Sequence, residues 1–124
     1  MTTALIIEDN EDNLELIKFI LEQANYKTRF VMTGLEGVLQ VTTIPPDFVI
    51  LDIQLPDING LEVLKRIRAH PVGKDIPIIA MTSYAMSGDR GRLMEAGCTG
   101  YIEKPIDPLL VIGQIEQVLG KGEP

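Results

Sequence analysis

The sequence has little of the residues that build disulfide-linked or thiolate-metal proteins. Its 124 residues include one cysteine, Cys98, one histidine, His70, and no tryptophan. A single cysteine excludes a disulfide framework and a cysteine-ligated metal site, so we expect Cys98 to be a small, semi-buried residue in a reducing cytoplasm. His70 precedes a proline and is expected to lie exposed at the end of a helix.

Long apolar runs and an excess of basic residues are also lacking. Apolar runs such as residues 4–7 and 109–112 are far shorter than the roughly 20 residues of a membrane span, so no membrane insertion is expected. The N-terminus lacks the basic segment of a secretory signal. The formal net charge of −7 argues against direct nucleic-acid binding. Lys65, Arg66 and Arg68 do cluster, but on one expected helix, where they predict a solvated face.

The composition is that of one globular domain. With 45% hydrophobic and 23% charged residues, the chain is typical of a folded protein and not of a disordered one. Its 124 residues suffice for a hydrophobic core but not for two ordinary domains. We therefore expect residues 1–124 to form a single domain with its core at about 3–119.

Five short apolar segments alternate with five segments of helical periodicity. Strands are predicted at residues 4–7, 27–31, 48–52, 76–81 and 100–103, and helices at about 11–24, 34–44, 61–69, 90–96 and 108–119. The more polar run 27–31 is expected at an edge of the sheet. The alternation predicts an α/β fold, in which a parallel sheet with right-handed crossovers has helices on both faces.

Two of these helices carry specific expectations. In the second, Leu35, Val38 and Leu39 are the apolar residues expected to face the sheet. The last helix is expected to start near Asp107–Pro108, because proline suits a first turn, and to carry Leu109 at the head of its apolar stripe.

Polar residues end four of the five strands. They are Glu8 and Asp9 after the first strand, Asp52 at the end of the third, Thr82 at the end of the fourth and Lys104 after the fifth. The carboxyl ends of parallel strands share one edge of a sheet, where open α/β sheets place their ligand sites. These side chains are therefore expected to converge.

The converging groups suit phosphoryl transfer. Neighbouring carboxylates raise one another's pKa unless a cation joins them. Because the ligands on offer are oxygens, the expected ion is Mg²⁺, or the similar Mn²⁺. A carboxylate can attack phosphorus to give an aspartyl-phosphate. Mg²⁺, the Lys104 ammonium and the Thr82 hydroxyl can stabilise the phosphoryl oxygens, which makes Asp52 a candidate phosphoacceptor.

Each residue alone also has a simpler explanation. Glu8 and Asp9 suit the start of a helix, and Asp52 suits a cap of the turn that follows it. Thr82 is typical of a turn, and Lys104 of a surface position. Only the convergence of these residues favours a site.

Five motifs follow one another at a characteristic spacing. They are Ile6–Asn10 (IIEDN), Leu51–Pro56 (LDIQLP) with Asn59–Gly60, Ala80–Ser83 (AMTS), Ala96–Gly97, and Gly100–Pro105 (GYIEKP). Together they resemble the receiver domain of two-component response regulators, of the CheY-like superfamily, over essentially the whole chain. Residues 59–63 and 97–98 favour the single-domain, DivK-like type. The resemblance implies a flavodoxin-like, five-stranded parallel sheet of order 2-1-3-4-5 with five helices on both faces.

The resemblance also implies a role for each acidic residue. Asp52 corresponds to the phosphoacceptor. Glu8, Asp9, Asp52 and the main-chain carbonyl of Gln54 correspond to the Mg²⁺ ligands. Glu8 stands where many relatives have aspartate, and its longer side chain would alter a water-mediated contact with the metal without removing the site.

The remaining roles concern the switch. Thr82 corresponds to the hydroxyl that moves toward the phosphoryl group, and Lys104 to the lysine that pairs with it. Tyr101 matches the aromatic residue that swings inward, although a half-exposed strand tyrosine explains it equally well. The Lys104–Pro105 peptide bond is expected to be cis, and Gln54 and Tyr84 occupy positions that tune phosphoryl lifetime.

The implied function is that of a cytoplasmic switch in a phosphorelay. A histidine kinase or histidine phosphotransfer protein would donate the phosphoryl group. The fourth helix, fifth strand and fifth helix would form the face that binds a downstream protein. The chain would catalyse its own phosphorylation and dephosphorylation without being a turnover enzyme. The alternative is a receiver module excised from a hybrid histidine kinase or a longer regulator.

Two other classes compete with this interpretation. A phosphatase with a nucleophilic aspartate typically needs a second carboxylate two residues later, where this chain has Gln54. A flavodoxin-like flavin protein needs a hydroxyl- or glycine-rich phosphate loop after the first strand, where this chain has acidic residues.

Overall fold

The computed structural model of the chain describes residues 2–83 and 90–120. Within these residues, parallel strands form one sheet in the order β2-β1-β3-β4-β5. The strands are β1 (Thr3–Ile7), β2 (Lys27–Val31), β3 (Phe48–Asp52), β4 (Ile78–Thr82) and β5 (Gly100–Glu103). The predicted sheet, its strand order and the edge position of residues 27–31 are confirmed.

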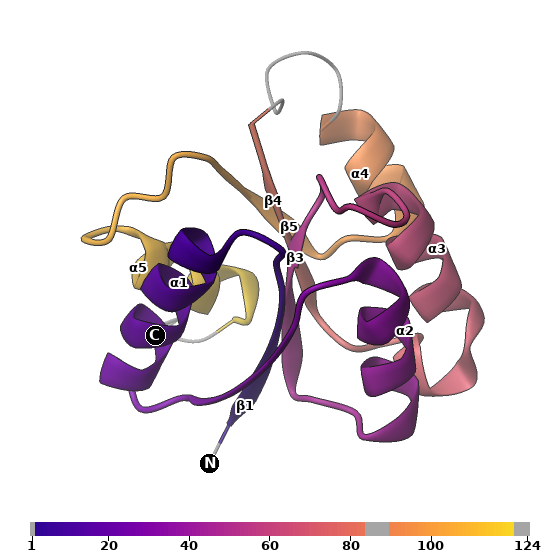
Figure 1. Ribbon diagram of the computed structural model, residues 1–124, viewed down its shortest axis with the longest axis horizontal. Helices are drawn as coiled ribbons and strands as arrows, with labels where there is room; N and C mark the ends of the chain where they lie inside the picture. Colours follow the sequence, from indigo (N-terminus) through magenta and orange to yellow (C-terminus); the bar gives the residue numbers. More distant parts are fainter. Residues whose placement is uncertain (1, 84–89, 121–124) are drawn as a thin grey trace.

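The helices lie on both faces of the sheet. They are α1 (Glu11–Gln23), α2 (Gly34–Thr43), α3 (Gly60–Ala69), α4 (Arg90–Ala96) and α5 (Val111–Val118), with a short 3-10 turn η1 (Pro71–Gly73) after α3. Figure 1 shows α1 and α5 on one side of the sheet, and α2, α3 and α4 on the other. In the described part of the chain, no helix is long and apolar enough to cross a membrane.

The central strand β3 separates two apolar clusters, one under each layer of helices. Phe48 and Ile50 pack in the cluster under α1 and α5, whereas Val49 and Leu51 pack in the cluster under α2, α3 and α4. Every residue of β3 is buried, which explains its continuous apolar sequence.

The register brings the carboxyl ends of three strands to one edge. Ile7 pairs with Leu51, so β1 and β3 end side by side, and Asp52 pairs with Met81 on β4. Residues that directly follow β1 therefore lie beside the end of β3, as the strand order predicts.

Two of the predicted helix ends follow from residues with positive φ. Asn25 (φ 69°) and Gly97 (φ 109°) directly follow the last turns of α1 and α4. The amides of Tyr26 and Cys98 reach back five residues, to the carbonyls of Leu21 and Leu93, at 3.0 and 3.1 Å. This is the Schellman arrangement, in which asparagine or glycine takes the left-handed position. It leaves Cys98 buried.

The predicted core face of α2 was partly wrong. Leu35 and Leu39 are exposed, and Gly34, Gly37 and Val41 are the buried residues of this helix. A side chain on Gly37 would collide with Ile7 of β1, so the helix approaches the sheet through Gly37 and not through its leucines.

The predicted start of the last helix was also wrong. Regular α5 begins at Val111, and Leu109 is 92% exposed. The Asp107 carboxylate accepts a hydrogen bond from the Leu109 amide at 2.9 Å, and the Asp107 carbonyl accepts from Leu110 and Val111. These bonds form a turn ahead of the helix, which directs Leu109 into solvent.

Arg68 does not belong to the predicted solvated face. From the last turn of α3, its guanidinium donates to the carbonyls of Gly97 at 2.9 Å, Gly73 at 2.8 Å and Ile76 at 2.6 Å. It also reaches the hydroxyl of Thr99 at 3.4 Å. One side chain thus connects the end of α3 with the segments before β4 and β5. Arg66 is exposed and pairs with Glu62, as expected of a solvated face.

Arg68→Ala is expected to lower the free energy of unfolding by about 2–3 kcal/mol, because several carbonyl oxygens lose a charged donor. Arg66→Ala is the matched control, because the exposed ion pair of Arg66 with Glu62 contributes about 0.5 kcal/mol or less. Urea unfolding followed by circular dichroism measures both changes. Equal losses in the two variants would contradict the role of Arg68.

Candidate functional site

Apolar strands deliver polar residues to a buried position at the carboxyl edge of the sheet. Glu8 directly follows β1 and is 1% exposed, Asp52 ends β3 and is 3% exposed, and Thr82 ends β4 and is 2% exposed. Asp9 is exposed beside them. Ionisable groups are rarely buried without partners, so this edge requires a specific electrostatic explanation.

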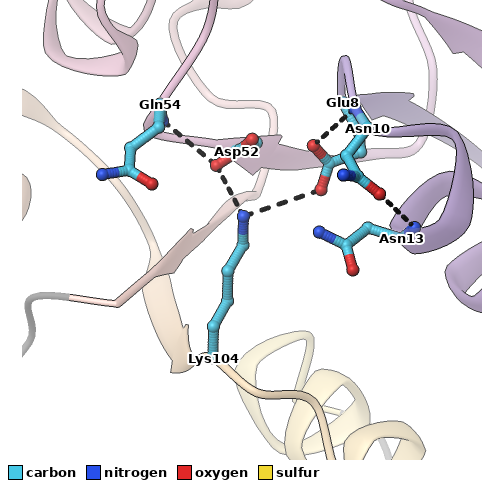
Figure 2. A network of polar contacts seen from close by, with 6 residues as sticks. All are labelled: Glu8, Asn10, Asn13, Asp52, Gln54 and Lys104. Carbon is cyan, nitrogen blue, oxygen red and sulfur yellow. Dashed lines mark hydrogen bonds and ion pairs between the residues drawn. The ribbon is translucent and has the colours of Figure 1, made fainter.

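Asp52 is held by two donors from different parts of the chain. Lys104 Nζ lies 2.9 Å from Asp52 Oδ1, and the main-chain N–H of Gln54 donates to the same oxygen at 3.1 Å (Figure 2). Lys104 directly follows β5, where its amide donates to the carbonyl of Thr82 at 2.9 Å. The Lys104–Pro105 peptide bond is cis.

Glu8 is less well satisfied than Asp52. Its Oε2 accepts from the amide of Asn10 at 3.3 Å. Its Oε1 lies 3.7 Å from Lys104 Nζ and has no hydrogen-bond partner among the described residues. The pKa of the Glu8 carboxyl is raised to about 7, chiefly by burial and then by the neighbouring Asp52, while Lys104 opposes the shift. The predicted repulsion between carboxylates is present, but burial is the larger cause.

The carboxylates fit a divalent cation. One ligand oxygen from each of Glu8, Asp9 and Asp52 lies within 4.8 Å of the others. Oε1 of Glu8 has no hydrogen-bond partner among the described residues and is therefore available as a ligand for such an ion. When ionised, the three carboxylates carry three negative charges, and the Lys104 ammonium carries one positive charge. The two negative charges that remain match the charge of Mg²⁺. The oxygen-only donor set favours the same ion.

Thr82 and Tyr101, which are predicted to act as the switch, lie on neighbouring strands. Thr82 pairs in register with Glu103, and Tyr101 pairs with Ala80. Tyr101 is partly buried and packs against the apolar cluster under α2, α3 and α4. Tyr84 lies outside the described residues.

Two contacts at the site were not predicted from the sequence. The Gln54 amide orients Asp52, although only the Gln54 carbonyl was expected to act. An aspartate that accepts from the amide two residues later is a common turn feature, so this signal was readable. The Asn10 side chain caps α1 by accepting a hydrogen bond from the amide of Asn13, and the main-chain amide of Asn10 donates to the Glu8 carboxylate. The second of these bonds depends on the local turn after β1.

The fold and site together define a doubly wound α/β protein of CheY-like architecture, with an acidic site where β1 and β3 end side by side. The family model of the response regulator receiver domain matches residues 4–116, and the chain belongs to this family. The fold class and the resemblance predicted from the sequence are thereby confirmed.

Similar proteins include DivK, the polar-differentiation response regulator of Brucella ovis. It is 39% identical over 118 residues, which cover 95% of this chain and 96% of DivK. A crystal structure of a putative response regulator from Chloroflexus aurantiacus is 31% identical with a TM-score of 0.90, covering 97% of this chain and 98% of that one. The receiver domain of a Pseudomonas aeruginosa sensor histidine kinase, with a magnesium ion coordinated in its active-site cleft, is 29% identical with a TM-score of 0.88, again covering 97% and 98%.

The raised pKa of Glu8 predicts how the stability of the metal-free protein depends on pH. The folded carboxyl, with a pKa of about 7, retains a proton that an ordinary carboxyl, with a pKa of 4.5, releases in the unfolded chain. Its contribution to stability is complete below the ordinary pKa and is lost as pH rises through about 7. From pH ~5 to pH ~8, the wild type is expected to lose on the order of 2 kcal/mol more than Glu8→Gln, whose amide cannot ionise.

Urea unfolding in EDTA over this pH range measures the difference. MgCl₂ is expected to restore most of the loss in the wild type at the high end of the range, because the cation offsets the buried charge. Parallel pH curves for the two proteins would contradict the assignment to Glu8.

Proposed function

We propose that the chain is the phosphoacceptor receiver of a two-component phosphorelay, in which Asp52 takes a phosphoryl group from a histidine kinase or histidine phosphotransfer protein. Residues 1–124 would act as a single receiver domain with its core at about 3–119. The observation that carries the proposal is the placement of Asp52. Its carboxylate is buried at the sheet edge, held by Lys104 and the Gln54 amide, beside two further carboxylates.

In the proposed reaction, an oxygen of the Asp52 carboxylate attacks phosphorus. A bond forms between that oxygen and phosphorus, while the bond from phosphorus to the donor imidazole nitrogen breaks and its electron pair stays on the nitrogen. The transferred group bears negative charge on its equatorial oxygens, so the residues act through positioning and electrostatics rather than through proton transfer.

The chain's own residues divide this work. The Gln54 amide fixes the orientation of the Asp52 carboxylate. The Lys104 ammonium, which contacts Asp52 Oδ1, would shift its contact to a phosphoryl oxygen after transfer. Thr82 would donate its hydroxyl from the end of the neighbouring strand. Glu8, Asp9, Asp52 and the Gln54 carbonyl would hold Mg²⁺ (or Mn²⁺). When bound, the ion would offset the negative charge of both the carboxylates and the incoming phosphoryl group.

Phosphorylation would change a surface through Thr82 and Tyr101. Attraction of the Thr82 hydroxyl to the phosphoryl group would open space that the Tyr101 ring can enter. A groove between α4, β5 and α5, lined by Met94, Tyr101 and Val118 among others, lies on the face that would change. A downstream protein that binds the two states differently would read the phosphorylation state.

Two observations bear on the biological context. The similarity to DivK supports a switch that acts through protein contacts and not through turnover of a substrate. The similarity to the receiver of a sensor histidine kinase supports the alternative, a receiver module of a hybrid kinase or longer regulator. The same chemistry at Asp52 serves both.

Incubation with acetyl phosphate and Mg²⁺ is expected to add one phosphoryl mass to the protein, with acetate as the leaving group, and Asp52→Ala is expected to add none. Intact-protein mass spectrometry measures the adduct. Asp47→Ala is the control: it removes a carboxylate that directly precedes β3, at the edge of the sheet opposite Asp52, and it is expected to gain the phosphoryl mass as the wild type does. No adduct on the wild type, or one that survives Asp52→Ala, would defeat the proposal.

The switch can be followed with one reporter, because the chain has no tryptophan. In a Tyr101→Trp variant, acetyl phosphate with Mg²⁺ is expected to shift the emission maximum to shorter wavelength as the ring moves inward. Adding Thr82→Ala is expected to abolish this shift while the phosphoryl adduct still forms. An emission maximum that stays constant in a phosphorylated Tyr101→Trp protein would argue against inward movement at this position.

A further inference from the structure

The loop between β3 and α3 (residues 53–59) is attached to the start of α2 by one aspartate. Asp57 Oδ1 accepts a hydrogen bond from the amide of Gly34 at 2.8 Å, and Oδ2 accepts from the amide of Leu35 at 2.9 Å. These are the first two amides of α2, and such amides have no acceptor inside their own helix. The bond from Leu35, more than that from Gly34, holds the pKa of Asp57 below its usual value.

The local N-cap of α2 serves a different amide. The Thr33 hydroxyl accepts from the amide of Glu36 at 3.2 Å. The first turn of α2 therefore depends on two acceptors, one adjacent in sequence and one from the loop after β3. Asp57 is also favourable there because a carboxylate meets the positive end of the helix dipole.

Close packing reinforces the attachment. A Cβ atom on Gly34 would lie 2.7 Å from Val63 Cγ2 and 2.8 Å from Ile58 Cγ1, so only glycine lets the start of α2 contact the loop and α3 this closely. At the base of the loop, the Gly60 amide donates to the carbonyl of Ile53 at 2.8 Å. The loop is thus fixed at its base and near its tip.

The same loop carries the main-chain groups that act on Asp52. The Gln54 amide orients the Asp52 carboxylate, and the Gln54 carbonyl is the main-chain Mg²⁺ ligand of the proposed site. We propose that Asp57 is a positioning residue for this site: by holding the loop against α2, it keeps the main chain of Gln54 in place for Asp52 and Mg²⁺. This inference rests on the proposed function, since it concerns the same site.

The Kd for Mg²⁺, measured by isothermal titration calorimetry on the full chain, tests the inference. Asp57→Ala is expected to raise Kd about tenfold, the low end of the effect of removing a residue that supports metal ligands. Asp57→Asn is expected to give an intermediate value, because its single amide oxygen can still accept from one of the two N–H groups.

Asp47→Ala is the matched control. Asp47 directly precedes β3, at the edge of the sheet opposite Asp52, and its Oδ2 accepts from the amide of Thr3 at 2.6 Å. The control removes one negative charge and one aspartate–backbone hydrogen bond, whereas Asp57→Ala removes one negative charge and two such bonds. It is expected to lower the urea midpoint while leaving the Kd for Mg²⁺ unchanged.

An unchanged Kd in Asp57→Ala overturns the inference, and so does an equal rise in Asp47→Ala. If Asp57→Ala does not fold, the Kd of Asp57→Asn decides: a raised value supports the inference and the wild-type value overturns it. A wild-type chain that binds no Mg²⁺ and accepts no phosphoryl group contradicts the proposed function itself, and the inference fails with it. The two failures are therefore distinguishable.

Discussion

Repulsion among Glu8, Asp9 and Asp52, opposed by a single ammonium group from Lys104, is the interaction on which the site depends. The strand order places β1 beside β3, so the carboxylates that follow these strands meet at one edge. Glu8 and Asp52 are buried at the ends of apolar strands, which weakens the screening of their charge. In the absence of a cation, burial and the neighbouring Asp52 raise the pKa of Glu8, and a proton on Glu8 then relieves the repulsion. The arrangement that makes this edge costly in electrostatic energy is the one that suits it to bind Mg²⁺.

The order of the sheet and the convergence of the strand ends could be predicted from the sequence. A run of apolar residues that is buried on both faces, as in β3, leaves a clear pattern. Strands that alternate with helices require parallel pairing, and parallel pairing brings Glu8, Asp52 and Lys104 to one edge without further information.

Contacts between distant segments could not be predicted in this way. Leu35 has the spacing of a core residue, but the close approach of Gly37 to Ile7 decides which face of α2 lies against β1. The charged residues next to Arg68 in the sequence predict a solvated side chain, but its hydrogen-bond acceptors include Thr99, which is 31 residues away in the sequence. The bond from Gly34 to Asp57 spans 23 residues and has no local signature. Periodicity indicates which side of a helix or strand is apolar. It does not indicate which distant side chain will bind the carbonyls and amides at the ends of that helix or strand.

The burial of Cys98 gives the molecule a natural reporter of its own local opening. The thiol lies directly after Gly97 at the end of α4, its sulfur is 3.5 Å from Met94 Sδ, and burial raises its pKa. A reagent that alkylates thiolates reacts with Cys98 only after this part of the structure opens, because in the closed form the thiol is buried and protonated. Since the chain has one cysteine, the rate of its modification measures how readily this region opens, without any engineered label.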